Sequence, residues 1–455
     1  MKRRQFLIGA AAVGLGAWWL KPGDRGAPHD DYFRNLQSTL QSLGAGRPLL
    51  VIDRERLRQN CERLIDNLPQ GKAFRIVAKS LPSLALIREV MALTGSQRLM
   101  TFHQPFMSAL AAAEPEADLL LGKPMPVAAA AQFYRELDRS NGFAPATQVQ
   151  WLIDSLPRLE QYLALAESLQ ERFRISIEID VGLHRGGLQQ AEEIDALLEL
   201  IRQHPEQLQL AGLMGYDAHV GKMPGFIEST ETSLRKSNAI YQSFVDRIRN
   251  QHSDLWREDL VLNGAGSPTI RLHDESSPLN EVSAGSCLLK PTDFDLPLLG
   301  DFEPAAFIAT PVLKKLDGLT LPGPLPIGSL WQGWDPNRAT TLFIYGGKWM
   351  AKPESPAGLS ENTLYGSSSN QMMLNGSAAQ QLNVDDWIFL RPTQSEAVLL
   401  QFGDMLALDT EHTAQWWGPR GARPGGGAVF TAAARCGFVI TANRGAVQFC
   451  HTPRA

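Results

Sequence analysis

The stretch FRIVAKSLPSLALIREV, residues 74–90, contains the strand-to-helix unit on which the fold prediction rests. Its apolar residues up to Ala78 are typical of a short buried strand, and the spacing of apolar residues from Leu84 to Val90 indicates a helix. A Ser-Leu-Pro-Ser break separates the two, and Lys79 stands where the strand ends. Taken alone, such a lysine is more often a side chain that extends from a strand end into water.

The same unit recurs between about residues 48 and 290, where short apolar runs alternate with amphipathic stretches. Runs that are apolar at nearly every position indicate strands buried on both faces, as in a parallel sheet with helical crossovers. About eight units predict an α/β fold of the (β/α)₈ barrel type, with an open doubly wound sheet as the alternative. The strand candidates are LLVID (49–53), FRIVAK (74–79), RLMTF (98–102), ADLLLGK (117–123), QVQWLID (148–154), RISIEID (174–180), LQLAGLMGY (208–216) and DLVLNGAGS (259–267).

After about residue 300 the helical patterns end, and β-rich runs punctuated by Pro and Gly begin, such as ATTLFIYGG and DWIFLRP. This change predicts a separate antiparallel β domain. The expected organisation is a signal or anchor at 1–25, the barrel at 26–300 and the β domain at 301–455.

The first residues, MKRRQFLIGAAAVGLGAWWL, combine a basic start with an apolar segment, which is the pattern of an export signal. Arg3-Arg4 also resembles a twin-arginine signal, so we expect a periplasmic protein. An uncleaved inner-membrane anchor is the alternative, because no clear cleavage site follows. A net charge of −5 over 455 residues, with no other basic block, argues against nucleic-acid binding, and four scattered cysteines give no zinc or disulfide framework.

Ligands of a parallel barrel bind at the carboxyl ends of its strands, so the polar residues there are the candidates for chemistry. Each is weak alone, since a strand-end Asp such as Asp154 is often a helix N-cap and a histidine is often a cap or an interface residue. The candidates are Lys79, His103, Lys123, Asp154, Asp180, Tyr216 and His219.

The segment NGAGSPT, residues 263–269, carries a stronger signal. Its glycines let the backbone approach a ligand, and its amides and hydroxyls are suited to cradling a phosphate. A plain Gly-rich turn is the alternative. A strand-end lysine together with a late phosphate loop suggests a Schiff base to pyridoxal phosphate, for which the lysine must be partly desolvated.

As a set, these motifs resemble the fold-type III pyridoxal-phosphate enzymes. This group comprises the alanine racemase amino-terminal barrel and, within it, the branch of D-threonine aldolase and D-serine dehydratase. RIVAKSLPSLALI resembles the lysine motif, EIDVGLHRGGL the Asp-x-Gly-x-x-Arg-x-Gly turn, GLMGYDAHVG the tyrosine strand, and NGAGSPT the phosphate loop. EVSAGSCLL (281–289) resembles the segment that closes the barrel. The resemblance covers roughly residues 47–295 in consistent order.

The resemblance implies roles for individual residues. Lys79 would hold the cofactor and transfer protons, Arg185 would order the site beside it, and Tyr216 or His219 would pack beside the pyridine ring, His219 also being a catalytic candidate. Ser283 stands where alanine racemases have an arginine against the ring nitrogen, and a neutral hydroxyl would keep that nitrogen unprotonated. The residues that would bind the cofactor are Lys79, Tyr216, Asn263, Gly264, Gly266, Ser267, Ser283 and Gly285.

In the second domain the resemblance is fainter. His412 falls on a metal-binding histidine of the branch, but Ala414 stands where the branch has its metal-binding cysteine. Because one histidine without its thiolate partner makes a poor divalent site, we expect no complete metal site.

The sequence therefore predicts a pyridoxal-phosphate enzyme that acts on a small amino acid. The preferred reaction is aldol cleavage or dehydration of a D-β-hydroxy amino acid, amino-acid racemisation is a second possibility, and a non-catalytic protein that binds the cofactor is a third. The resemblance also implies a homodimer.

Overall fold

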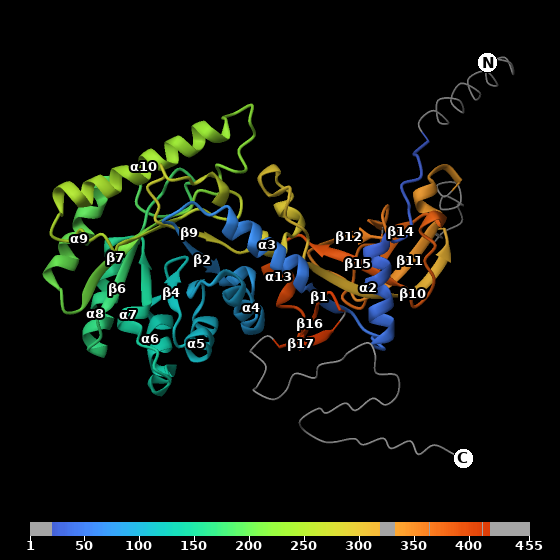
Figure 1. Ribbon diagram of the computed structural model, residues 1–455, viewed down its shortest axis with the longest axis horizontal. Helices are drawn as coiled ribbons and strands as arrows, with labels where there is room; N and C mark the ends of the chain where they lie inside the picture. Colours follow the sequence, from blue (N-terminus) through green and yellow to red (C-terminus); the bar gives the residue numbers. More distant parts are fainter. Residues whose placement is uncertain (1–20, 319–332, 364, 412, 419–455) are drawn as a thin grey trace.

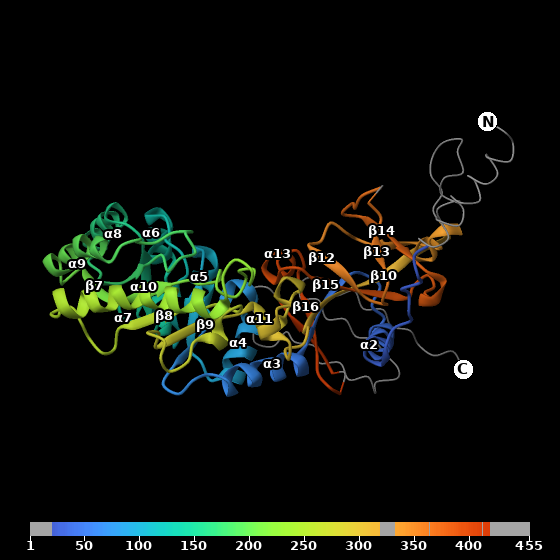
Figure 2. The same ribbon diagram turned by 90° about the horizontal axis from the view of Figure 1, so that it is seen from above.

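The computed structural model describes residues 21–318, 333–363, 365–411 and 413–418 of the chain. Figures 1 and 2 show a barrel surrounded by helices beside a β-rich part, with the barrel in the blue-to-yellow middle of the chain. Within the described residues, none of the helices combines the length and the apolar character needed to cross a membrane. The barrel and the β-rich part confirm the barrel and the β domain that the sequence predicts.

Eight parallel strands close the barrel, and each pairs with the next until the last pairs with the first. The closing register sets Phe74 opposite Val282. The strands are β2 (Ala73–Val77), β3 (Arg98–Thr101), β4 (Asp118–Leu121), β5 (Val149–Ile153), β6 (Phe173–Glu178), β7 (Leu208–Gly215), β8 (Val261–Gly264) and β9 (Glu281–Ala284).

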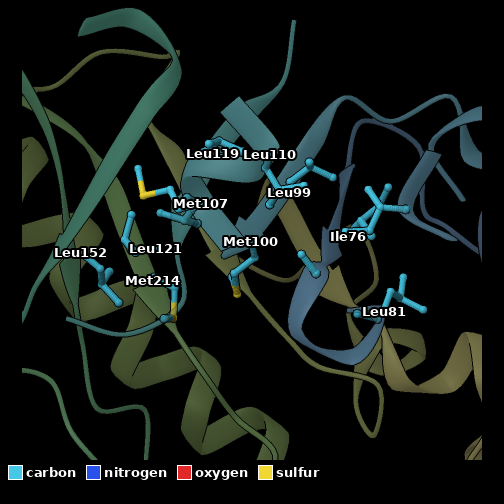
Figure 3. Close-up of a cluster of buried hydrophobic side chains, with 14 of the residues drawn as sticks. Ile76, Leu81, Leu99, Met100, Met107, Leu110, Leu119, Leu121, Leu152 and Met214 are labelled. Atoms are coloured by element: carbon cyan, nitrogen blue, oxygen red, sulfur yellow. The ribbon is translucent and has the colours of Figure 1, made fainter. Parts of the chain in front are cut away.

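Helices surround the barrel because their apolar faces pack on the apolar outer faces of the strands. In Figure 3, Met107 and Leu110 of α5 lie against Leu99 of β3 and Leu119 of β4, all within one buried cluster. The helices of this part are α3 (Arg54–Asp66), α4 (Leu84–Thr94), α5 (Gln104–Ala113), α6 (Val127–Glu136), α7 (Pro145–Gln148), α8 (Leu156–Leu169), α9 (Ile194–Gln203), α10 (Thr230–Gln251) and α11 (Ser286–Leu289).

The described residues of the β domain form a nine-stranded sheet that is antiparallel except for the parallel pair β1–β16. Its elements are α2 (Asp31–Ser42), β1 (Leu49–Asp53), β10 (Ala306–Asp317), β11 (Thr340–Tyr345), β12 (Ala351–Ser355), β13 (Ser360–Glu361), β14 (Gln371–Gly376), β15 (Trp387–Pro392), α13 (Ser395–Leu399), β16 (Met405–Leu408) and β17 (Ala414–Trp417).

One strand differs from the sequence prediction. The run LLVID was expected to be the first barrel strand, but β1 pairs with β10 and β16 in the second sheet. It is apolar throughout because it is an inner strand of that sheet, and its face is covered by α2 through Phe33, Leu36 and Leu40. From α2 onward the described chain therefore passes first through the β domain, then forms the barrel and returns, and β9 rather than β1 completes the barrel.

Candidate functional site

Lys79 occupies a short turn directly after β2. The turn spans Ala78–Ser80, and Ser83 then caps α4 by accepting a hydrogen bond from the Leu86 amide. This local order, strand then turn then capped helix, sets Lys79 at the carboxyl end of the barrel. Its side chain lines a cavity of about 510 Å³, a size that suits a small-molecule ligand.

The β domain contributes to the same cavity. Glu396, in α13, has its Oε1 3.6 Å from the Nζ of Lys79. The ring of Phe102 lies on another side of the lysine, with its centroid 5.0 Å from Nζ. The amine is therefore held between a carboxylate and an aromatic ring, while 43% of the lysine side chain stays exposed.

Arg185 reaches the cavity from the turn after β6, which is shaped by left-handed residues. Gly182 and Gly187 have φ values of +108° and +93°, and His184 has +54°. Asp180 holds the turn by accepting hydrogen bonds from the backbone amides of Gly182 and His184 and from the His184 ring. Burial alone would raise the pKa of Asp180, but the bonds from His184 and Gly182 outweigh it and lower the pKa.

Tyr216 lies at the end of β7 and links this turn to the loop after β8. The guanidinium carbon of Arg185 stands 4.6 Å from the centroid of the Tyr216 ring, a cation–π contact. On its other side, a Cβ atom added to Gly266 would meet the Tyr216 ring at 2.5 Å. The close approach of loop and ring thus requires glycine at position 266.

The loops after β8 and β9 form a cup of hydrogen-bond donors. Ser267 Oγ accepts hydrogen bonds from the amides of Gly285 and Cys287, at 3.4 and 3.0 Å, which leaves its own hydroxyl hydrogen free to donate. Among the described residues, the amides of Ser267 and Ser286 donate to no acceptor. These groups fit an anion such as a phosphate, and Ser267, Gly285 and Ser286 all line the cavity.

The cup adjoins the Lys79 turn and is supported from below. A Cβ atom on Gly285 would lie 2.6 Å from the carbonyl oxygen of Val77, so this glycine allows the contact. Beneath the loop, the buried Asp217 accepts hydrogen bonds from Thr269 Oγ1 and His273 Nε2, both at 2.7 Å. Thr269 Oγ1 in turn accepts from the Gly266 amide, which fixes the loop to the barrel.

One carboxyl group of the cavity was expected from the sequence and another was not. Asp154 is among the predicted strand-end candidates, and the helix cap was its alternative interpretation, but no side chain caps α8 and Asp154 lines the cavity. Glu178 was not among the candidates. This residue, at the end of β6, is buried and also lines the cavity. Burial and the neighbouring charge of Asp154 raise the pKa of Glu178 to about 7. A carboxyl group within the apolar run of β6 was the available signal, because β6 is buried along most of its length.

The structure brings most of the predicted site residues together at this cavity. Gly264 is not among them, since it packs against Leu279 behind the loop. The predicted residues that line the cavity are Lys79, Lys123, Asp154, Arg185, Tyr216, Asn263, Gly266, Ser267, Ser283 and Gly285.

His219 does not line the cavity, contrary to the expectation that it serves as a catalytic residue there. Its Nε2 lies 3.3 Å from Ser237 Oγ of α10 and would be 3.1 Å from a Cβ atom on Gly182. The imidazole thus packs behind the Arg185 turn, where burial lowers its pKa. His103 is a helix cap, which was the alternative interpretation of this residue, because its Nδ1 accepts a hydrogen bond from the Phe106 amide.

The expected metal position can be followed only in part. His412 lies outside the described residues. Ala414 is fully buried in the apolar cluster under α2, which also contains Leu408 and Trp387. In the part of the chain that the structure describes, no three His, Cys, Asp or Glu side chains are grouped so as to hold a metal ion. The expectation of no complete metal site stays a prediction.

Solved structures with the same fold include enzymes of different activities. D-threo-3-hydroxyaspartate dehydratase from Delftia sp. HT23 is 18% identical, with 83% of this chain and 98% of that chain covered and a TM-score of 0.63. D-threonine aldolase from Filomicrobium marinum is 16% identical, with 82% of this chain and 97% of that chain covered and a TM-score of 0.62. Alanine racemase from Bacillus anthracis with bound L-Ala-P is 13% identical, with 85% of this chain and 98% of that chain covered and a TM-score of 0.57.

No curated protein sequence matches the chain. The family model described as "Alanine racemase, N-terminal domain" matches residues 52–292, more than half of the chain, and this range contains the whole barrel with Lys79. The chain belongs to the alanine racemase N-terminal domain family.

Proposed function

We propose that this protein is a pyridoxal-phosphate enzyme that acts on a small amino acid. The observation that supports the proposal most directly is the placement of the Lys79 amine and of the free donors of Ser267 and Ser286 in the cup on one cavity. An amine and an anion site across one pocket are the two anchors that this cofactor requires.

The residues of the cavity fit that cofactor. Lys79 Nζ would hold the aldehyde, the cup would hold the phosphate, and Tyr216 would support the ring. The buried Ser283 lies on β9 below the cup, next to Asn263 on β8. Pyridoxal phosphate supplies an electron sink for bonds at the α-carbon of an amino acid. The protein then has to bind and orient the amino acid and to move protons at defined atoms.

We favour lyase chemistry on a D-β-hydroxy amino acid, and Glu178 supports that choice. A carboxyl group with a pKa of about 7 can both accept and donate a proton near neutral pH. In aldol cleavage it would take the proton of the β-hydroxyl while the Cα–Cβ bond breaks. In dehydration it would give a proton to the departing β-hydroxyl, while Lys79 Nζ takes the proton from the α-carbon.

Racemisation is the second candidate, and the same pair of groups favours it. Lys79 and Glu178 both line the cavity, and two proton-transfer groups are what inversion of an α-carbon needs. The lyase is preferred because two of the structures with this fold are named as enzymes of D-hydroxyaspartate and D-threonine.

The test supplies D-threonine, D-serine, D-threo-3-hydroxyaspartate and both alanine enantiomers to the cofactor-loaded protein. Aldehyde, keto acid and optical rotation are followed, with Lys79→Ala as the inactive control. Aldehyde or keto acid from a D-β-hydroxy amino acid supports the lyase, and loss of optical rotation without either product supports the racemase. A protein that binds the cofactor and transforms none of these substrates would be a binding protein instead.

We also propose export to the periplasm, or anchoring in the inner membrane, and assembly as a homodimer. The support is the basic-apolar pattern of residues 1–20, which lie outside the described residues, and the family resemblance. Cell fractionation of the wild type and of an Arg3→Lys, Arg4→Lys double variant tests the export route, and light scattering of the purified protein tests the dimer.

A further inference from the structure

A chain of buried polar groups runs under the cavity and ends at Ser283. The Arg75 guanidinium donates to both oxygens of the Glu281 carboxylate, at 2.6 and 2.9 Å, and Arg98 donates to Oε2 at 2.7 Å. Asn263 Nδ2 then donates to Glu281 Oε1 and to Ser283 Oγ, both at 2.7 Å. Arg75, Glu281, Asn263 and Ser283 are all at most 2% exposed.

The carboxylate fixes which way the Asn263 amide points. Glu281 has two guanidinium partners, so its oxygens act as acceptors toward their remaining neighbour. Turning the amide over would put Asn263 Oδ1 against Glu281 Oε1, two acceptors at hydrogen-bond distance. The N–H₂ group therefore faces Glu281, and its second hydrogen is directed to Ser283.

This orientation has a cost that is visible in the structure. Asn263 Oδ1 is buried and has no hydrogen-bond partner among the described residues. Unsatisfied buried acceptors are uncommon in folded proteins and call for an explanation. In this orientation both N–H groups of the Asn263 amide are hydrogen-bonded, while its oxygen has no partner among the described residues.

Ser283 consequently presents a hydrogen atom to the cavity. One lone pair of its Oγ is occupied by the Asn263 N–H, so its own hydrogen is free to donate. Ser283 and Asn263 line the cavity one step below the cup on β9 and β8. In pyridoxal phosphate the ring nitrogen lies opposite the aldehyde carbon. If the aldehyde is bound at Lys79 and the phosphate in the cup, Ser283 and Asn263 would be the residues available to the ring nitrogen.

We propose that Asn263 is a positioning residue that sets the Ser283 hydroxyl as a donor to the ring nitrogen, and so keeps that nitrogen unprotonated. The inference rests on the proposed function and goes beyond it, because it assigns the protonation state of the cofactor to a polar chain specific to these residues. A nitrogen held unprotonated makes the ring a weaker electron sink, which favours chemistry that needs only modest stabilisation at the α-carbon.

The experiment loads the protein with pyridoxal phosphate that carries ¹⁵N in the ring and records the ¹⁵N chemical shift by solid-state NMR. In Asn263→Asp the side chain has no N–H for Ser283, so Ser283 donates to the carboxyl group instead and offers a lone pair to the ring. The matched control is Asn60→Asp, since Asn60 is also a fully buried asparagine but donates to the carbonyls of Leu288 and Glu303 away from the cavity.

The proposal expects an unprotonated-pyridine shift in the wild type and in Asn60→Asp, and a move towards the pyridinium shift in Asn263→Asp. A pyridinium shift in the wild type, or no difference between Asn263→Asp and the wild type, would overturn it. A wild type that takes up no cofactor removes the proposed function itself, which is a distinct result.

A second measurement covers the case in which Asn263→Asp does not fold. The wild type should bind pyridoxal phosphate roughly threefold to tenfold more tightly than the analogue with C–H in place of the ring nitrogen, as one hydrogen bond predicts. Ser283→Ala should bind the two equally. Equal binding of both compounds by the wild type would contradict the proposal.

Discussion

Lys79 Nζ lies 3.6 Å from Glu396 Oε1, so the amine at the end of the second strand of the chain is paired with a carboxylate from the β domain. The barrel thus supplies the amine and the donor cup, while α13 supplies the counter-ion. Both side chains are partly exposed, at 43% and 31%, and an ion pair of this kind contributes little to stability.

Replacing Glu396 by Gln should therefore lower the free energy of unfolding by less than about 1 kcal/mol, since solvent screens the pair. Urea unfolding of the cofactor-free protein measures it. Asp293→Asn is the matched control, because Asp293 lines the cavity without an ion pair to Lys79. A loss of several kcal/mol in Glu396→Gln alone would show that α13 is held in place by this contact.

Glu178 should make stability depend on pH in a defined direction. Its pKa is raised from 4.5 to about 7 by burial and by Asp154, so the folded protein holds a proton that the unfolded chain releases. Stability therefore falls as the pH rises from about 4.5 and levels off above about 7. Glu178→Gln has no carboxyl group to titrate, so its free energy of unfolding should not fall over this pH range. Near pH 8 the variant should be more stable than the wild type by about 1.5 kcal/mol, a value reduced to allow for solvent screening in the cavity.

Urea unfolding of both proteins between about pH 4 and pH 8 checks this prediction. The two unfolding free energies should converge near pH 4, where both side chains are neutral. A constant difference across the range would mean that Glu178 does not titrate between these limits.

Gly266→Ala should weaken cofactor binding at least about fivefold. The new Cβ atom would lie 2.5 Å from the Tyr216 ring, so either the loop or the ring must shift, at a cost of about 1–3 kcal/mol. Gly225→Ala is the control, because nothing lies within 4 Å of its added Cβ atom. Titration with pyridoxal phosphate gives both affinities, and an unchanged affinity in Gly266→Ala would remove Tyr216 and this loop from the proposed site.

Asp217→Ala should destabilise the protein by about 3 kcal/mol or more, because it leaves the buried Thr269 hydroxyl and His273 ring without their shared acceptor. The loop that these groups support should also lose order. Chemical denaturation measures the first effect, and amide hydrogen exchange at residues 264–270 the second. Normal protection of that loop in the variant would show that the buried group does not support it.

Much of the site could be predicted because its residues stand at strand ends. Lys79, Arg185 and Tyr216 each follow a recognisable apolar run, and the topology of a parallel barrel brings such positions to one rim. That these three residues lie in one cavity could therefore be predicted without knowing how the side chains pack.

The remainder depends on packing between segments that are distant in sequence. The run LLVID has the apolar pattern of a barrel strand, and nothing in the pattern shows that its neighbours are β10 and β16. His219 follows Tyr216 closely, but its ring turns towards α10. Glu396 reaches Lys79 only because α13 folds back onto the barrel, a contact across more than three hundred residues that local spacing does not encode.

The most direct test of the account is to identify which residue holds the cofactor. The protein is loaded with pyridoxal phosphate, reduced with borohydride, digested and mapped by mass spectrometry, with Lys79→Ala treated in parallel. We predict the phosphopyridoxyl group on Lys79 and no labelling in the variant. A label on Lys123 or Lys222, the other lysines of the cavity, or no label on the wild type, would contradict the central claim.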